Sequence, residues 1–140
     1  MPLARAIPPP TKEQQRRQDA AREAGCIVAR RLGLGFVPGE IHHLTEGGRT
    51  ISQDHTVCLN PWSHRGEVWG QWTAAQCRRV FGPSLAREKR AFHAEYGDNV
   101  SLLVYQNALI HWPMPDEHRK RRRGATVSPS KIIPREAARR

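Results

Sequence analysis

The pattern of hydrophobic and polar residues along the chain predicts several helices and only a few short strands. Residues 12–24 are rich in strong helix formers and lie between Thr11, a good N-cap, and Gly25, a good C-cap, so we expect a helix there. This segment has almost no apolar face. It is therefore expected to be a solvated helix, or an arm that settles on a binding partner.

The next part of the chain, CIVARRLGLGFVPGEIHHLTEGGR in one-letter code, is expected to form strand and turn, because glycine and proline interrupt it repeatedly. Short strands are expected near residues 40–44 and 56–59. Asn60 and Pro61 then suit an N-cap and a first helical position, so a helix should follow directly. The sequence thus predicts the order strand, loop, strand, helix.

Two further helices are expected in the second half of the chain. One begins after Thr73 and ends near Phe81, and the other runs from Asp98 to about Ile110, where the apolar residues have helical spacing. Past Pro113 the composition becomes polar and basic, which predicts disorder. We therefore predict an α+β fold in which a small hairpin-plus-helix core carries additional helices and has disordered basic termini.

The same patterns divide the chain into three parts. Residues 1–24 form a proline-containing, basic N-terminal arm or helix, residues 25–112 form the folded domain, and residues 113–140 form a disordered basic tail. The domain is short enough to hold one modest core.

The formal net charge of +10 is concentrated near the C-terminus. Residues 118–140 contain nine Lys or Arg and one acidic residue, a net charge of +8, whereas residues 1–117 contain fourteen basic and twelve acidic residues, a net charge of +2. A concentrated basic segment favours a polyanionic partner, most commonly nucleic acid. A membrane surface fits less well, because the segment has no flanking apolar stripe. A solvated tail without a function is the alternative.

The cysteines and the apolar runs indicate in which cellular compartment the protein is found. Cys26, Cys58 and Cys77 are odd in number and widely spaced, which is not typical of a disulfide framework. No apolar run approaches the roughly 20 residues needed to cross a bilayer. The first ten residues lack the apolar core of a signal peptide. These features predict a protein of a reducing cytoplasm.

Four of the seven histidines lie between residues 42 and 64. His42 and His43 are neighbours on an expected strand, so their side chains point to opposite faces. His55 lies in the loop or at the start of the next strand, and His64 lies early on the following helix. Hydrolysis of a phosphodiester needs a divalent cation with open coordination positions and a base for water, and imidazoles can supply both. These histidines therefore predict a one-metal hydrolytic site, and surface or core-edge histidines are the alternative.

Five motifs follow one another along the chain: EIHHL, GGR, PWSHRG, GPSLA and FHAEYG. In this order they resemble the Ref-like, RecA-dependent phage nucleases, which are HNH endonucleases linked to recombination enhancement. The resemblance covers about residues 25–110. It implies that residues 25–112 are an HNH-like nuclease domain with a ββα-metal core. It also implies a DNA substrate, dependence on RecA filaments, and a phage or prophage origin, so that the cytoplasm is that of the bacterial host cell.

The resemblance implies roles for the histidines. His43 is the general base, and His42 and His64 hold the metal, which would be Mg²⁺ or another divalent ion such as Mn²⁺. His55 stands near the position of the middle Asn or His of such sites, where it would orient the loop and the base. Gln53 replaces a histidine that is usual in the family. The remaining histidines have no partner at a useful spacing and are assigned no role: His93, His111 and His118.

The sequence departs from the family at the structural zinc site that HNH proteins of this kind usually carry. Cys26 is present, but Ala29, Asn60 and Ser63 stand where the other three ligands are expected. We therefore expect no structural zinc and interpret Cys26 as a small buried hydrophobe. The other two cysteines could restore a site only if the fold brought them close to Cys26.

DNA contacts are expected from basic residues near the histidines and in the tail: Arg30, Arg31, Arg65, Arg119, Lys120, Arg121, Arg122 and Arg123. The alternative to an enzyme is a catalytically decayed HNH scaffold that binds DNA or a recombinase. The missing zinc ligands and the basic tail motivate this alternative, whereas the retention of His42, His43 and His64 favours an active endonuclease.

Overall fold

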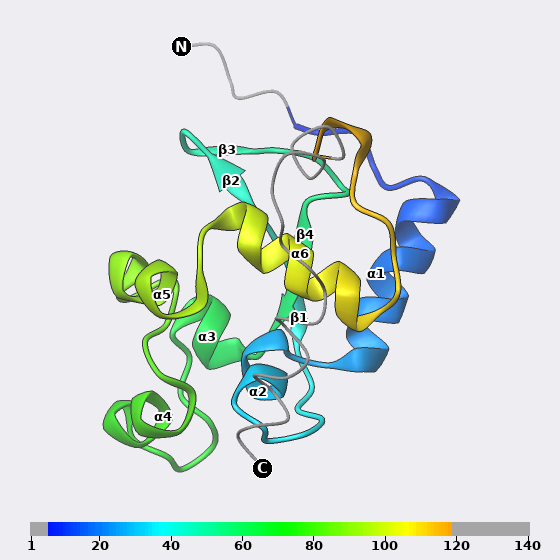
Figure 1. The fold of residues 1–140 in the computed structure, drawn as a ribbon. Coiled ribbons are helices and arrows are strands. Elements are labelled where there is room, and N and C mark those ends of the chain that lie inside the picture. The colour runs from blue at the N-terminus through cyan, green and yellow to red at the C-terminus, as the bar shows by residue number, and fades with distance from the viewer. Residues whose placement is uncertain (1–5, 119–140) are drawn as a thin grey trace.

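The computed structural model describes residues 6–118, in which helices surround a central pair of short strands (Figure 1). The α+β class expected from the sequence is confirmed. Residues 1–5 and 119–140, and with them the expected DNA contacts at 119–123, lie outside the described residues. The elements follow in the order α1 (Lys12–Ala24), α2 (Ile27–Arg31), β1 (Glu40–His43), β2 (Thr45–Glu46), β3 (Arg49–Thr50), β4 (Thr56–Leu59), α3 (Pro61–Arg65), α4 (Ala74–Phe81), α5 (Lys89–Tyr96) and α6 (Asn99–Leu109).

The strands β1 and β4 form the antiparallel pair at the centre of the fold. Glu40 lies opposite Leu59, and His43 lies opposite Thr56. Every residue of β4 is buried, because α1, α2, α3 and α6 all pack against it (Figure 1). The strand pair is therefore a rigid support for the side chains that β1 presents to either face.

The edge of β4 that faces away from β1 is satisfied by side chains instead of a third strand. Arg17 on α1 donates a hydrogen bond to the Thr56 carbonyl oxygen at 2.8 Å. Gln106 on α6 accepts one from the Cys58 N–H at 2.7 Å. Arg17 also donates to Thr56 Oγ1 at 2.5 Å and to Asn107 Oδ1 at 2.7 Å. Because buried backbone polar groups need partners, these long side chains replace a neighbouring strand.

The sequence predicts a solvated helix or arm over residues 12–24, but α1 is part of the folded body. Its N-cap at Thr11 is as predicted. However, Arg17, Gln18 and Ala21 are buried. The buried face of α1 is built on hydrogen-bonded polar side chains, so it leaves no apolar stripe in the sequence. The expected boundary at residue 24 therefore does not separate an arm from a domain.

The other local predictions are largely confirmed. The strands β1 and β4 and the helices α3, α4 and α6 lie within one or two residues of their expected positions. Asn60, Thr73 and Asp98 each cap a helix with a side-chain oxygen that accepts a backbone N–H. The helix α2 is a correction, because the glycines and prolines of this segment predict strand and turn over residues 27–31. Burial of Ile27 and its neighbours against β4 outweighs that local preference.

A glycine hairpin joins β2 to β3 and projects from one end of the strand pair (Figure 1). Gly47 and Gly48 both have positive φ, 60° and 76°, as a two-residue hairpin turn of type I′ requires. Glu46 lies opposite Arg49 in this hairpin. The turn places Thr45, Glu46 and Gly47 at the rim of the pocket described below.

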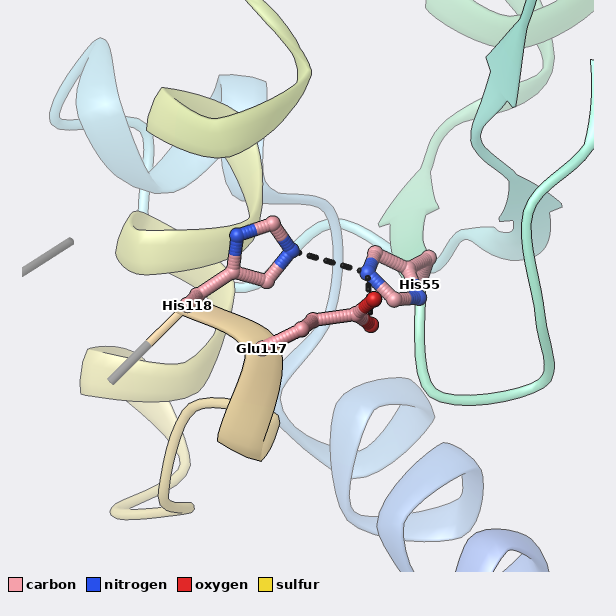
Figure 2. A group of neighbouring side chains, drawn as sticks. All are labelled: His55, Glu117 and His118. Carbon is pink, nitrogen blue, oxygen red and sulfur yellow. Dashed lines mark hydrogen bonds and ion pairs between the residues drawn. The ribbon is translucent and has the colours of Figure 1, made fainter. Parts of the chain in front are cut away.

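The sequence predicts disorder from residue 113, but residues 113–118 are folded. Met114 is buried in the core, and a helical turn follows it. His118, in this turn, lies beside His55 (Figure 2). Burial of Met114 and the hydrogen bond that Asn107 Nδ2 donates to the Pro113 carbonyl oxygen at 3.2 Å hold this short segment on the domain, and the average composition of the tail conceals them.

Candidate functional site

His42 on β1 and His64 on α3 lie against each other, as their positions in the sequence predict. The ring centroids are 4.7 Å apart and the rings are inclined by 60°. This contact arises because Asn60 and Pro61 start α3 directly after β4, so that α3 turns back over β1. Both imidazoles line an open pocket of about 540 Å³.

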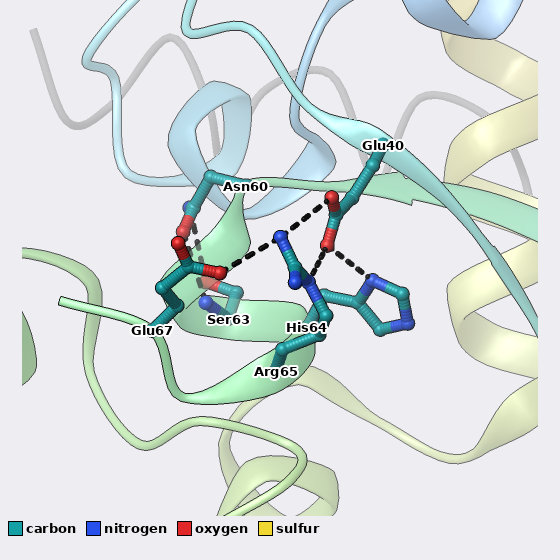
Figure 3. Close-up of polar contacts among 6 residues, drawn as sticks. All are labelled: Glu40, Asn60, Ser63, His64, Arg65 and Glu67. Atoms are coloured by element: carbon teal, nitrogen blue, oxygen red, sulfur yellow. Dashed lines mark hydrogen bonds and ion pairs between the residues drawn. The ribbon is translucent and has the colours of Figure 1, made fainter. Parts of the chain in front are cut away.

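Glu40 fixes the orientation of His64 (Figure 3). Its Oε1 accepts hydrogen bonds from His64 Nδ1 at 2.7 Å and from Arg65 Nε at 2.6 Å. Partial burial acts to raise the pKa of Glu40, but the hydrogen bonds from Arg65 and His64 outweigh it and lower the pKa. With the proton on Nδ1 directed at a charged carboxylate, His64 Nε2 carries the lone pair. This pairing is typical of metal-binding histidines.

His93 on α5 lines the same pocket, although the sequence assigned it no role. Its Nδ1 donates to the Gly97 carbonyl oxygen at 2.9 Å, which leaves the Nε2 lone pair free to bind a ligand. His93 is 51 residues from His42 and 29 residues from His64 in the sequence, so spacing could not reveal the contact. The packing of α5 beside α6 brings it to the pocket (Figure 1).

The surroundings of His42 keep its ring neutral. Burial lowers the pKa of His42 to about 4. The charge of Lys89 adds to this effect, as do the rings of His64, His43 and His93 when they carry a proton. His42 is therefore unprotonated at pH 7, which is the form in which imidazole binds a metal.

His43 points to the other face of β1 and contacts Gln53. His43 Nε2 lies 2.8 Å from Gln53 Oε1. Gln53 Nε2 donates to the Pro8 carbonyl oxygen at 3.0 Å, which identifies Oε1 as the acceptor. His43 therefore donates from Nε2 and keeps its lone pair on Nδ1. The pocket lining includes His42 but not His43.

The partner of His43 is thus Gln53, and His55 does not occupy the place expected for it. His55 Nδ1 lies 2.6 Å from Ser52 Oγ, and its Nε2 faces His118. The structure thus brings Gln53, and not His55, to His43, because a loop sequence does not fix which side chain turns towards β1. The replacement of a family histidine by Gln53 is the one signal in the sequence that pointed to this residue.

The four positions of the expected zinc site do come together in the structure. Cys26, Ala29, Asn60 and Ser63 are all fully buried. Asn60 Nδ2 donates to Cys26 Sγ at 3.2 Å and to Ser63 Oγ at 3.0 Å. Burial raises the pKa of the Cys26 thiol, although several hydrogen bonds act in the opposite direction, so the sulfur is protonated. All three cysteines are free and buried, in agreement with the absence of a disulfide framework.

Three of the arginines expected to contact DNA lie among residues 6–118, and these three have partners within the protein. Arg30 Nε donates to the Ala24 carbonyl oxygen at 2.9 Å. Arg31 donates to the Tyr96 carbonyl oxygen at 2.5 Å and lies over the Tyr105 ring, so it ties α2 to α5 and α6. Arg65 is half exposed but pairs with Glu40 and with Glu67 at 2.8 Å (Figure 3).

The described residues therefore define an α+β domain in which a central strand pair and the helices around it bring three histidines to one pocket. A model of the family described as recombination enhancement, RecA-dependent nuclease matches residues 10–111. The chain belongs to this family, as its motifs indicated. A comparison with curated proteins gave no match. Among residues 6–118, no helix is long and apolar enough to span a bilayer.

Proposed function

We propose that this protein is a metal-dependent DNA endonuclease of the HNH type. The observation that carries the proposal is the convergence of His42, His64 and His93 on one open pocket. The ring of His64 is oriented by Glu40, and that of His93 by the Gly97 carbonyl oxygen. Membership of a family described as RecA-dependent nucleases supports this reading.

The donor set fits a divalent cation. His42 and His64 would hold the ion, and His93 lines the same pocket. A bound cation would stabilise the charge that develops on the phosphate and leave open positions for water and substrate. Imidazole donors suit Mn²⁺ or later transition metals better than Mg²⁺, which prefers carboxylates and water. Of the two ions expected from the sequence, Mn²⁺ is therefore the better match.

The resemblance makes His43 the proposed general base, although its ring lies on the face of β1 opposite His42 and outside the lining of the pocket. The hydrogen bond from its Nε2 to Gln53 fixes the ring and leaves Nδ1 able to accept a proton. In the hydrolysis, Nδ1 would accept the proton of a water molecule as its oxygen attacks phosphorus and the bond to the leaving oxygen breaks. Gln53 is then a positioning residue, the role that the resemblance implies for His55.

The proposed partners are DNA and the RecA filament. The family description supports the second. The net charge of +8 over residues 118–140 supports the first, because basic residues bind phosphates with little regard to base sequence.

Cleavage assays on variants of the full chain test the proposal. Supercoiled and single-stranded DNA are incubated with Mg²⁺, Mn²⁺ or Zn²⁺, with and without RecA filaments. His43→Ala should lower kcat by about 10²-fold to 10⁴-fold and leave DNA binding intact. His64→Ala should raise the metal concentration needed for half-maximal activity. His111→Asn is the matched control, because His111 is exposed and lies outside the pocket.

The results of these assays distinguish an active enzyme from a catalytically decayed scaffold. Wild-type cleavage by His43→Ala would remove His43 as the base and point to the neighbouring His42. An absence of cleavage under every condition, with DNA binding retained, would favour the decayed scaffold.

A further inference from the structure

A second group of possible metal ligands lies beside the candidate active site. His55 Nε2 lies 2.9 Å from His118 Nε2 and 3.1 Å from Glu117 Oε1 (Figure 2). One ligand atom from each residue lies within 4.8 Å of the others. They line a cavity of about 230 Å³ that shares Glu46 and Asn99 with the larger pocket. The two sites are therefore neighbours, but they have no histidine in common.

We propose that His55, Glu117 and His118 bind a second divalent transition-metal ion. Two ligand atoms on a metal with bonds of 2.0–2.1 Å in tetrahedral geometry are about 3.3 Å apart. The separations of 2.9 Å and 3.1 Å need to grow by only a few tenths of an ångström. The Glu117 side chain is 62% exposed and can make this adjustment.

The hydrogen bonds around His55 support a metal ligand. Ser52 Oγ lies 2.6 Å from His55 Nδ1 and can accept its proton, which would leave the lone pair on Nε2. That nitrogen then faces a carboxylate and a second imidazole nitrogen. If His55 Nε2 carried a proton, Glu117 and His118 would have to share it as acceptors. A metal cation instead accepts a lone pair from each of the three atoms.

The donors select the kind of ion. Two imidazoles and one carboxylate suit Zn²⁺ or a similar borderline metal, and they do not suit Mg²⁺ or Ca²⁺, which prefer oxygen ligands. Glu117 and His118 follow the end of the family match at residue 111, so the site is an addition to the region that the family description covers. The ion would join the loop before β4 to the helical turn at 116–118. It would thus anchor the chain at the point where the basic residues 119–123 follow in the sequence.

Zinc binding at the proposed site is measured best in a protein whose other pocket has lost one of its metal ligands. The full-length His64→Ala protein, stripped with a chelator, is titrated with Zn²⁺ by calorimetry and with Co²⁺ by visible absorption. One ion should bind per chain, and Zn²⁺ should raise the melting temperature by several degrees. Adding His118→Asn or Glu117→Gln should weaken binding at least tenfold and remove the rise in melting temperature. Both substitutions lie at the surface turn, so the variants should remain folded.

The control and the opposing results are as follows. His111→Asn in the same His64→Ala background should bind Zn²⁺ like its parent, because His111 is exposed and outside the cluster. Equal Zn²⁺ affinity with and without His118→Asn would overturn the proposal, as would an absence of micromolar binding by the His64→Ala protein. Neither result would bear on cleavage through His42 and His64, because those residues belong to the other pocket.

Discussion

Replacing Arg17 by methionine tests whether side chains from the helices hold the outer edge of β4. Arg17 is 1% exposed and donates hydrogen bonds through Nε, Nη1 and Nη2 to Asn107 and Thr56. Methionine keeps most of the apolar stem but leaves the Thr56 carbonyl and the Asn107 amide oxygen without a donor. Each buried acceptor that loses its partner costs about 1–3 kcal/mol. Burial of the cation, which lowers the pKa of Arg17 to about 10 despite the nearby Asp54, offsets part of this cost.

We therefore expect Arg17→Met to lower the free energy of unfolding by about 3 kcal/mol and the melting temperature by about 10 °C. Urea denaturation followed by tryptophan fluorescence measures the change. Arg16→Met is the matched control, because Arg16 is exposed on the same helix and should change stability by less than about 0.5 kcal/mol. Equal stabilities of the two variants would refute the reasoning. Arg17→Lys should fall between Arg17→Met and the wild type, because lysine keeps the charge but not the planar fork of donors.

Three further outcomes are expected. In the presence of a chelator, stability should fall as the pH decreases from about 6.5 to 4, because unfolded His42 takes up a proton in this range and folded His42, with a pKa of about 4, does not. The free energy of unfolding should fall by at most about 3 kcal/mol, which denaturant titrations across this pH range measure. A free energy of unfolding that does not change with pH would contradict the burial of a neutral His42 ring. Zinc content should be the same for wild type and Cys26→Ala by elemental analysis, and the Co²⁺ form should lack a thiolate charge-transfer band, since the other ligands of a Cys26 site are absent. A thiolate band lost in the variant would instead reveal a zinc–cysteine site. Removal of residues 119–140, which carry a net charge of +8, should weaken DNA binding and flatten its dependence on salt, as filter binding at several salt concentrations can show. An unchanged slope would mean that DNA binds elsewhere.

The features that the sequence predicts well are those set by neighbouring residues. Caps such as Thr11, Asn60 and Asp98 act on backbone groups within the next turn, so the helix starts could be placed. The meeting of His42 and His64 also followed from local order, because a strand, a return strand and a helix start leave little freedom in between.

The features that the sequence misses depend on contacts between distant segments. His93 reaches the pocket only through the packing of α5, and His55 meets His118 across 63 residues. The sequence also does not show that Gln53 contacts His43, because the strand on which a loop residue packs decides the side to which it turns. The burial of Arg17 is not expected for a charged side chain. It is explained only by the hydrogen-bond acceptors that the fold brings to it.

Because the edge of β4 has to stay covered, the helices that cover it determine how far the chain can be shortened before it aggregates. A strand edge with free backbone groups pairs readily with other chains, and the β4 sequence TVCL has no charge to prevent this. Its cover comes from both ends of the domain, from α1 and from α6. A fragment reduced to the hairpin and α3, residues 40–65, would keep His42 and His64 but expose this edge. Such a fragment should aggregate through strand pairing, so the useful limits for expression are the two covering helices and not the histidine motif that they enclose.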